Sequence, residues 1–138
     1  MGLVTKLLLT YQVIKNEVTR LANGTPTPGD SDYRGGAVTR TEVGQPLSSF
    51  YGRLVDGIFQ SQAEVDAHAT QDGAAPGRFR YADINGDGIV NDSDRTTIGS
   101  PHPDFTYGLN FNFGYKNFDL SAFLNGSQGN DIYNYSKI

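Results

Sequence analysis

The chain has 138 residues, with 11 Lys and Arg against 15 Asp and Glu, a formal net charge of −4 at pH 7, and no cysteine. The lack of cysteine excludes a disulfide scaffold, a thiolate metal site and a cysteine nucleophile, and the acidic balance argues against general nucleic-acid binding. Seventeen glycines, eight tyrosines and eight phenylalanines favour β structure over a helical bundle. The sequence contains no run of about 18 apolar residues, so we expect no transmembrane helix.

The first predicted element is a β-strand over residues 7–15, where the sequence LLLTYQVIK is apolar over a strand's length. Alternate residues of this run are apolar and share one face: Leu7, Leu9, Tyr11 and Val13. Leu8 and Ile14 interrupt the alternation, which leaves a short helix open as the alternative.

Residues 16–103 contain most of the glycine and nearly all of the charge, and the sequence predicts one long, elaborated loop region here. Asn23-Gly24 is a turn signal, and residues 23–36 lack any pattern that buries a core. We expect short, irregular strands within residues 37–60. The S-x-x-E sequence that begins at Ser61 is a capping box, which predicts one short helix over 62–69.

The most specific motif is a calcium-type loop from Asp83 to Asp94, DINGDGIVNDSD. Carboxylates and amides at loop positions 1, 3, 5, 9 and 12, a glycine at position 6 and a backbone carbonyl at position 7 follow the spacing that surrounds Ca²⁺ with oxygens. The predicted ligands are Asp83, Asn85, Asp87, Ile89, Asn91 and Asp94. Aspartate at position 12 is closer to the dockerin variant than to a paired EF-hand. The alternative is a metal-free loop held by local side-chain hydrogen bonds.

Residues 104–128 predict a β-hairpin, because apolar and small polar residues alternate strictly from Phe105 to Tyr115 and again after Lys116-Asn117. If Lys116 and Asn117 form a two-residue turn, the numbers of paired residues sum to 233. The pairs then fall on one apolar face: Tyr115 with Phe118, Phe113 with Leu120, Phe111 with Ala122, and Leu109 with Leu124. Phe123 is the exception, an aromatic residue on the polar face.

The apolar face of this hairpin has two interpretations. In a soluble sandwich it meets a second sheet, whereas in an outer-membrane barrel it meets lipid and the Asn, Thr, Ser and Gly face lines the lumen. Strands of this length suit both, since tilted membrane strands need roughly 9–11 residues. The pattern alone favours the soluble form, which is the more common one.

The sequence contains no combination of residues that resembles an active site. His68 lies in the predicted short helix and His102 between two prolines, and neither has a suitable partner at useful spacing, so surface roles are expected for both. Glycoside hydrolysis needs a pair of carboxylic acids at a suitable separation, and no convincing pair occurs.

Five segments, in this order along the chain, resemble the SusC/RagA family of TonB-linked outer-membrane proteins. They cover nearly all of the chain after about residue 15: KNEVTRLANG (15–24), TRTEVGQPLSSFYG (39–52), DGIFQSQAEVDAH (56–68), RFRYADINGDGIVNDSDRTTIGSPHPDFTYGLNF (78–111) and NFDLSAFLNGSQGNDIYN (117–134). Each segment alone is a weak signal, but the ordered set is specific. The resemblance therefore favours the outer-membrane barrel over the soluble sandwich for the apolar face of the hairpin.

The resemblance implies an all-β fold, a partial segment of a transmembrane antiparallel β-barrel with a long extracellular loop that carries one short helix and the calcium-type loop. Such family members enclose an N-terminal plug in a barrel of about 22 strands. Residues 7–15 and 104–128 are then barrel strands from the C-terminal half, 16–103 is extracellular, and 129–138 begins the next loop. This chain is expected to be a fragment that does not transport by itself.

The resemblance also implies a function, which is nutrient import across the cell outer membrane rather than catalysis. Its implied partners are TonB, a SusD-like surface lipoprotein, outer-membrane lipid and a glycan or peptide substrate, with calcium as the expected cofactor. The alternative is a soluble calcium-dependent binding module, dockerin-like or lectin-like, which predicts a water-soluble monomer that gains structure on adding Ca²⁺.

Overall fold

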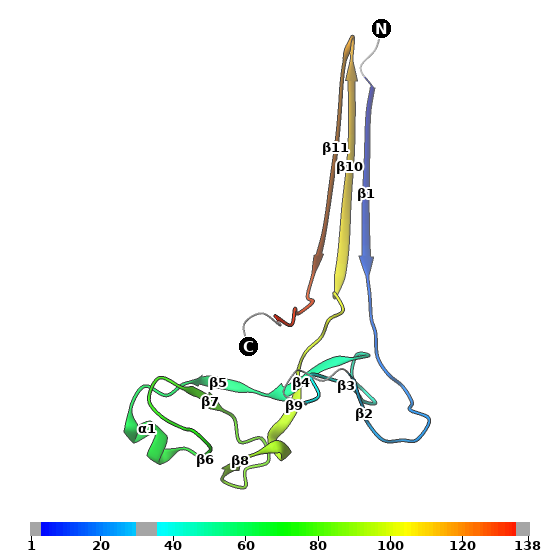
Figure 1. Ribbon diagram of the computed structural model, residues 1–138. Helices are drawn as coiled ribbons and strands as arrows, with labels where there is room; N and C mark the ends of the chain where they lie inside the picture. The colour runs from blue at the N-terminus through cyan, green and yellow to red at the C-terminus, as the bar shows by residue number, and fades with distance from the viewer. Residues whose placement is uncertain (1–3, 30–35, 135–138) are drawn as a thin grey trace.

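A computed structural model describes residues 4–29 and 36–134. The chain forms two parts: a long, narrow sheet at one end and a lobe of short elements at the other (Figure 1). We call the first part the long sheet and the second, built from residues 16–103, the lobe. The parts of the predicted segments 23–36 and 129–138 that fall on 30–35 and 135–138 lie outside the described residues.

The long sheet has three antiparallel strands in the order β1-β10-β11: β1 (Val4–Val13), β10 (Phe105–Tyr115) and β11 (Phe118–Gln128). The central strand comes from the last third of the sequence, and it pairs along its length with both neighbours. The first strand therefore pairs with the predicted hairpin although the whole lobe lies between them in the sequence. No local pattern indicates a pairing between segments so far apart.

The hairpin has the register predicted from its hydrophobic pattern. Tyr115 pairs with Phe118, Phe111 with Ala122, and the ladder runs without a break to Phe105 and Gln128. Lys116 takes a positive φ of 55° at the first position of the two-residue turn. Turn length and hydrophobic pattern thus specify the same pairing, as expected where one face is apolar.

The first strand differs from its predicted range of 7–15, because it begins at Val4 and ends at Val13. Its start follows from β10, whose last residues extend far enough for Gly114 to pair with Val4. The Ile14 amide still donates to the carbonyl of Asp104, at 3.0 Å, before the chain leaves the sheet. The alternative of a short helix is wrong here.

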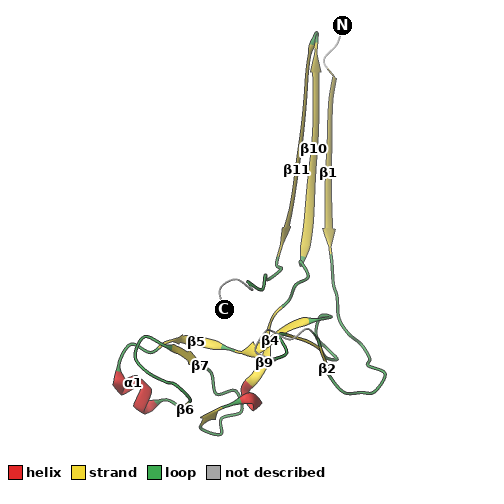
Figure 2. Ribbon diagram, viewed as in Figure 1, coloured by secondary structure: helices red, strands yellow, loops and turns green. Residues whose placement is uncertain are grey.

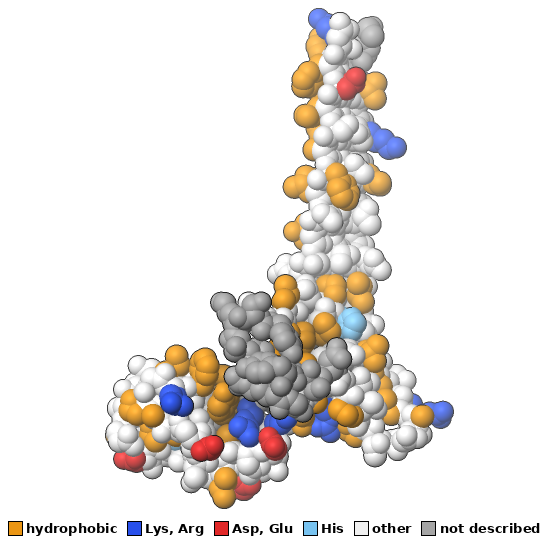
Figure 3. Space-filling view, viewed as in Figure 1, with side chains coloured by type: hydrophobic (Ala, Val, Ile, Leu, Met, Phe, Trp, Pro, Cys, Tyr) orange, Lys and Arg blue, Asp and Glu red, His pale blue; other side chains and the backbone are white. Residues whose placement is uncertain are grey.

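The long sheet has no core of its own. Its apolar side chains are largely exposed, with exposed fractions of 64% at Leu7, 69% at Leu9 and 56% at Leu124. Hydrophobic side chains stand out along this part of the molecule in Figure 3. Within the described residues, β1 and β11 each pair on one side only. The sheet is therefore open at both edges and on both faces.

The lobe is built from short strands, most of them antiparallel (Figure 2). One sheet has the order β2-β3-β4-β9, a second pairs β5 with β7, and β6 runs parallel to β8. The elements are β2 (Thr27–Pro28), β3 (Thr39–Thr41), β4 (Ser49–Arg53), β5 (Val55–Ile58), α1 (Gln62–Ala67), β6 (Thr70–Gln71), β7 (Phe79–Tyr81), β8 (Ile89–Val90), the 3₁₀ turn η1 (Asp92–Asp94) and β9 (Arg95–Gly99). The expected short, irregular strands of 37–60 are β3, β4 and β5.

The one α-helix among the described residues begins at the N-cap that the sequence predicts, because the Ser61 hydroxyl accepts a hydrogen bond from the Glu64 amide at 3.3 Å. The second half of the predicted capping box is displaced by one residue, since the Glu64 carboxylate accepts from the Gln60 amide at 3.0 Å and not from the Ser61 amide. The helix ends at Ala67 rather than at residue 69, because His68 adopts an extended backbone. Its ring then packs edge-on against Phe59, with ring centroids 5.3 Å apart.

The buried core of the lobe is small. Among the described residues the apolar members are Phe59, with an exposed fraction of 1%, and Val90, with 6%, and the buried polar members are Ser49 and Asp94. Arg80 adds an ion-pair link at the rim, because its guanidinium lies 3.2 Å from Asp56 and 3.6 Å from Glu64. No helix within residues 4–29 and 36–134 is both long enough and apolar enough to cross a membrane.

Candidate functional site

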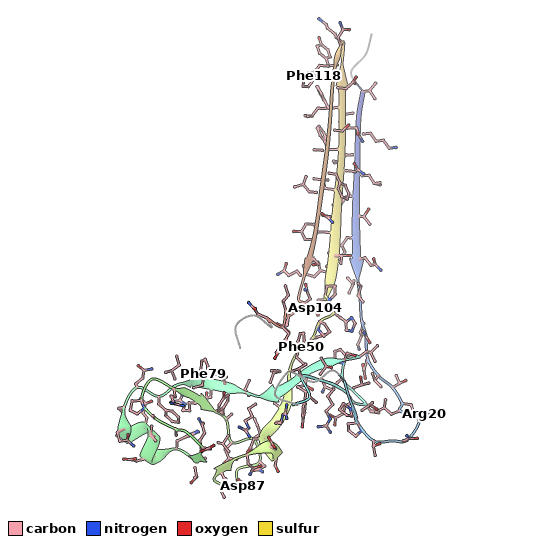
Figure 4. The ribbon with its side chains drawn as sticks, viewed as in Figure 1. Arg20, Phe50, Phe79, Asp87, Asp104 and Phe118 are labelled. Carbon is pink, nitrogen blue, oxygen red and sulfur yellow. The ribbon has the colours of Figure 1, made fainter. Side chains whose placement is uncertain are left out.

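The predicted calcium-type loop lies between β7 and β9 and includes β8 and η1. Figure 4 places Asp87 at the end of the molecule opposite Phe118, which marks the hairpin turn of the long sheet. The loop is thus carried by the lobe, far from the three long strands.

The first half of the loop is wound by side-chain to backbone hydrogen bonds. The Asp83 carboxylate accepts from the Gly86 amide with one oxygen and from the Gly88 amide with the other, both at 2.8 Å. The Asn85 side-chain oxygen accepts from the Asp87 amide at 2.8 Å. The Asn85 bond, to the amide two residues on, is an Asx turn, and the two Asp83 bonds extend the same side-chain to backbone bonding further along the loop.

Gly88, at loop position 6, has a φ of +83°, and a Cβ added to it meets no atom within 4 Å. Its requirement is therefore conformational rather than steric, as the spacing argument predicts. The Asp87 carboxylate is bonded within the loop in the same way. One of its oxygens accepts from the Ile89 amide at 2.8 Å, and the other accepts from the Asn85 side-chain amide at 3.0 Å.

Asp94 closes the loop from the far end. It is fully buried. One oxygen accepts from the amides of Ile84 (2.9 Å) and Asn85 (3.3 Å), and the other accepts from the Asn91 amide at 2.8 Å. The Asn91 amide contributes most to holding the pKa of Asp94 below its ordinary value, while burial opposes this shift. Asp94 therefore ties the beginning of the loop to its end.

The remaining predicted ligands bond to their neighbours in the chain. The Asn91 side chain donates to the Ile89 carbonyl at 3.2 Å, and its oxygen accepts from the Ser93 amide at 2.7 Å. All six predicted residues therefore lie in one continuous hydrogen-bonded loop, and Asp94 contacts the backbone of two other predicted ligands, Asn85 and Asn91.

The oxygens of this loop retain capacity for a cation. A carboxylate oxygen accepts up to two bonds, so each oxygen of Asp83 and Asp87 has one acceptor position left after its single hydrogen bond. Among the described residues, no three Asp, Glu or His side chains converge as a metal site. Three of the six predicted ligands are amide or carbonyl groups, and the calcium site stays a prediction.

Arg53 anchors the loop, and the sequence analysis did not single it out. From β4, its guanidinium donates to the Asn91 carbonyl at 3.2 Å and pairs with Asp92 at 3.1 Å. Thirty-eight residues separate Arg53 from Asn91, so no local spacing indicates the contact. The second anchor is Arg95, which follows η1 and donates to the Ala37 carbonyl at 2.7 Å.

Both histidines have structural contacts instead of the expected surface roles. The Nε2 atom of His68 lies 2.9 Å from the Tyr81 carbonyl oxygen, and that of His102 lies 2.9 Å from the Leu47 carbonyl oxygen. Both residues are half-buried. Each histidine therefore links two segments of the chain.

The polar face of the long sheet brings two sequence exceptions together. Leu8 and Phe123, which interrupt the alternation in β1 and β11, both pair with Asn110 of β10 and so form one row across the sheet. They are 55% and 66% exposed. In the next row towards the turn, the Ser121 hydroxyl donates to the Asn112 side chain at 2.9 Å. The polar face thus carries an isolated apolar row among amides and hydroxyls.

Comparisons with known proteins identify relatives of one kind. No family model matches the chain. TonB-dependent receptor P26 of Formosa agariphila is 40% identical over 100 residues, which is 72% of this chain and 10% of the receptor. TonB-dependent receptor P3 of the same organism is 36% identical over 126 residues, 88% of this chain and 13% of the receptor. TonB-dependent receptor SusC of Bacteroides thetaiotaomicron is 29% identical over 130 residues, 91% of this chain and 12% of the receptor.

The chain thus spans only 10–13% of the length of these curated relatives. Nearly all of it takes part in the matches, so the likeness covers the lobe as well as the long strands. TonB-dependent receptors, SusC included, are outer-membrane proteins, and the mostly β structure with its open three-stranded sheet fits a part of such a receptor. This chain belongs to the family of TonB-dependent receptors.

Proposed function

We propose that the chain forms part of the barrel wall of a TonB-dependent nutrient importer. The observation that carries the proposal is the long sheet, whose strands have 10 or 11 residues, an exposed apolar face and an opposite face of amides, hydroxyls and glycines. An apolar face this exposed is unfavourable in water and indicates a surface that is covered by lipid or protein. Lipid on one face, an aqueous lumen on the other and a neighbouring strand at each edge satisfy its exposed groups, apart from the apolar row of Leu8 and Phe123 on the polar face.

The connections between the strands support an orientation in the membrane. β10 and β11 are joined by two residues, whereas the whole lobe lies between β1 and β10. Outer-membrane barrels have short periplasmic turns and long extracellular loops. In the proposed orientation Lys116 and Asn117 are therefore periplasmic and the lobe is extracellular.

In this proposal the residues of the chain act by position and not by bond chemistry. The Asn110, Asn112 and Ser121 face lines the lumen, and the Phe111 and Leu120 face contacts lipid. The substrate is a glycan or an oligopeptide, delivered with a SusD-like lipoprotein, and TonB supplies the energy for import. The relatives are named as receptors, which supports a transport role over an enzymatic one.

We further propose that the Asp83–Asp94 loop binds Ca²⁺ at the cell surface. Its support is the ligand spacing together with the acceptor positions left on Asp83 and Asp87 after their hydrogen bonds are counted. A bound cation neutralises carboxylates that otherwise repel one another, and so stiffens the loop. Titration of the full-length receptor with Ca²⁺ by calorimetry tests this proposal.

In that titration the unmodified receptor is expected to release or absorb heat at this site, and the double variant Asp83→Ala, Asp87→Ala is expected to lose the signal. Asp72→Ala is the control, because Asp72 is an exposed acid of the lobe that lies outside the loop and is not among the predicted ligands. Equal binding by the double variant contradicts the calcium assignment.

The wall assignment is tested by cysteine labelling of the full-length receptor in outer membranes. Single cysteines at 111 and 120 are expected to react only with a lipid-soluble reagent, and those at 110 and 121 with a water-soluble one. Residues 110 and 111 are neighbours in β10, and residues 120 and 121 are neighbours in β11. Each comparison is therefore between two positions at nearly the same depth in the barrel. The opposite pattern contradicts the assignment of the two faces. Deletion of the receptor gene tests import itself, and unchanged uptake of every nutrient contradicts that role.

A further inference from the structure

The chain turns towards the lobe immediately after the long sheet ends. Strand β11 stops at Gln128, and Gly129 follows with a φ of +92°, a backbone conformation that favours glycine. Asp104, which faces Gly129, and Phe50, which is contacted further along, both lie between the long sheet and the lobe in Figure 4. Residues 129–133 therefore link the end of β11 to the lobe.

Asp131 makes the polar part of this link. Its backbone amide donates to the Ser100 carbonyl at 2.7 Å, and its carboxylate accepts from the Ser100 amide at 2.9 Å. Ser100 directly follows β9, and 31 residues separate it from Asp131. One residue of the segment thus satisfies both backbone groups of a residue at the end of a lobe strand, which fixes the direction of the contact as well as its position.

Two glycines allow this close approach. Gly99 has no positive φ, but a Cβ added to it would overlap the Asp131 carboxylate, whose carbon would be only 2.9 Å away. On the other segment, a Cβ added to Gly129 would overlap the Asp104 carboxylate. Each segment therefore places an aspartate against a glycine of the other, the pattern expected where two backbones come close together.

Tyr133 makes the apolar part of the link. Its ring stacks on Phe50 of β4, with ring centroids 6.2 Å apart and an angle of 30° between the planes. Stacking of this kind is one of the favourable arrangements of two aromatic rings. Strand β4 is the neighbour of β9 in the four-stranded sheet of the lobe, so the segment contacts two adjacent strands of the same sheet.

The two covalent connections of the lobe to the long sheet lie side by side, because the Ile14 amide donates to the Asp104 carbonyl at 3.0 Å. Two adjacent chains can bend together, and a few residues at the ends of elements are enough to form a hinge. Leu47 braces one of them, since its carbonyl oxygen lies 2.9 Å from Nε2 of His102. Residues 129–133 add an attachment from a third chain, whose strand β11 lies on the opposite side of β10 from β1.

We propose that residues 129–133 form a strap that locks the lobe to the long sheet, with Asp131 as its latch. With the strap closed, the lobe keeps one orientation relative to the barrel wall, and the loop that begins after β11 moves together with it. With the strap open, the lobe is held by its two adjacent connections and the Leu47 contact, and it swings about them. The inference goes beyond the import function and rests only on the proposed place of the long sheet in the barrel wall.

The test measures the distance between the lobe and the barrel in the full-length receptor, reconstituted in lipid nanodiscs. Spin labels are attached to single cysteines that replace Asp72, an exposed residue of the lobe, and Asn125, an exposed residue of β11, in a receptor with no other cysteine. Double electron–electron resonance then gives the distribution of distances between the two labels. Heat-modifiable migration on a gel verifies that each variant barrel is folded.

Two variants open the strap in different ways. Asp131→Ala removes the latch carboxylate, and Gly99→Ala pushes it away with a methyl group. Each variant has a matched control. Asp131→Asn keeps an oxygen that accepts from the Ser100 amide. Gly52→Ala adds a methyl group to the neighbouring strand β4, where the nearest atom is the flexible end of the Ile98 side chain, at 3.2 Å.

The unmodified receptor is expected to give one narrow distribution of distances, which both controls keep. Asp131→Ala and Gly99→Ala are expected to broaden it. In hydrogen exchange, the Ser100 amide of Asp131→Ala is expected to exchange about two- to tenfold faster, the scale of one hydrogen bond. A broad distribution in the unmodified receptor, an unchanged one in either opening variant, or equal broadening in the controls overturns the strap.

The failure of the strap is distinguishable from the failure of the wall assignment. The expected cysteine labelling at residues 110 and 111 in outer membranes, together with unchanged distances in the opening variants, removes only the strap. Reversed labelling at those two positions removes the proposed place of the long sheet in the barrel wall, on which the strap rests.

Discussion

The long sheet and the lobe satisfy their chemical groups in opposite ways. In the long sheet the backbone ladder is regular over 10 or 11 residues, yet apolar side chains such as Leu9 and Phe118 remain 69% and 59% exposed. In the lobe the strands are short, but Phe59 and Asp94 are buried, and side-chain bonds hold the loop that ends at Asp94. The sheet thus depends on surroundings beyond this chain, whereas the lobe depends on its own contacts.

The largest expected effect is in the lobe, at Phe59. Phe59→Ala removes the largest buried side chain of a very small core, and such a truncation costs about 3–5 kcal/mol. A lobe with so few buried residues is expected to lose its fold while the barrel stays intact. Amide hydrogen exchange of the full-length receptor measures this as faster exchange across residues 59–90, with exchange in β10 unchanged.

Phe79→Ala is the control for that experiment. Phe79 lies on β7 in the same part of the lobe, but 57% of it is exposed, so its truncation is expected to cost well below the value for Phe59. Equal effects of the two substitutions contradict the small-core description of the lobe.

The next effect is in the long sheet, at Phe111, which the proposed orientation places against lipid. A positive charge near the membrane midplane costs about 2–4 kcal/mol in a barrel, so Phe111→Arg is expected to lower the free energy of unfolding of the receptor by about that amount. Asn110→Arg, one residue earlier on the polar face, is expected to cost far less because its charge meets water. Urea titration of the receptor in lipid vesicles measures both variants. Equal losses contradict the view that only one face of the sheet contacts lipid.

The same contrast shows what sequence reasoning predicts well. The hairpin register followed from strict alternation and a two-residue turn, because a slip of one residue moves every Phe and Leu to the wrong face. The N-cap at Ser61 and the glycine at position 88 were likewise predictable, since capping and positive φ are local requirements. These features depend on residues within a few positions of each other.

Features that depend on distant segments were not predictable. The pairing of Val4 with Gly114, and with it the true start of the first strand, depends on the length of a strand a hundred residues away. Arg53 binds a loop 38 residues further on, and Leu8 and Phe123 share a row only through Asn110. In each case the chemistry of the residues was visible in the sequence, but their proximity required the three-dimensional register.

A smaller effect is expected where the lobe depends on a buried acid. Asp94→Asn leaves one carbonyl oxygen for three amides and turns an NH₂ group towards donors. The loop is expected to loosen without unfolding the rest of the lobe. Hydrogen exchange at Ile84, Asn85 and Asn91 reports it, and Asp92→Asn, at an exposed side chain, is the control that leaves these amides protected.

Asp94 also gives the lobe a pH dependence. Its pKa in the folded protein is lowered from the ordinary value of 3.8. Its stabilising contribution is therefore fully present above that ordinary value and is lost as the pH falls through the lowered folded pKa. The unfolding temperature of the lobe in the calcium-free receptor is therefore expected to fall as the pH is lowered below this ordinary value of 3.8. Asp94→Asn is expected to flatten this part of the profile, and an unchanged profile in the variant assigns the effect to other acids.

The smallest effect belongs to the hairpin turn of the long sheet. Lys116 holds a φ of 55°, which costs a residue with a Cβ but not glycine. A positive φ at the first turn position is the pattern in which type II′ hairpins place glycine. Lys116→Gly is therefore expected to stabilise the barrel by up to about 1 kcal/mol, measured by urea titration in lipid vesicles. Asn117→Gly is the control, because residue 117 does not have a positive φ and gains nothing from glycine. Destabilisation by Lys116→Gly contradicts this prediction, and it means that the contact of the lysine, whose Nζ lies 5.3 Å from the centre of the Tyr115 ring, outweighs the cost of the positive φ.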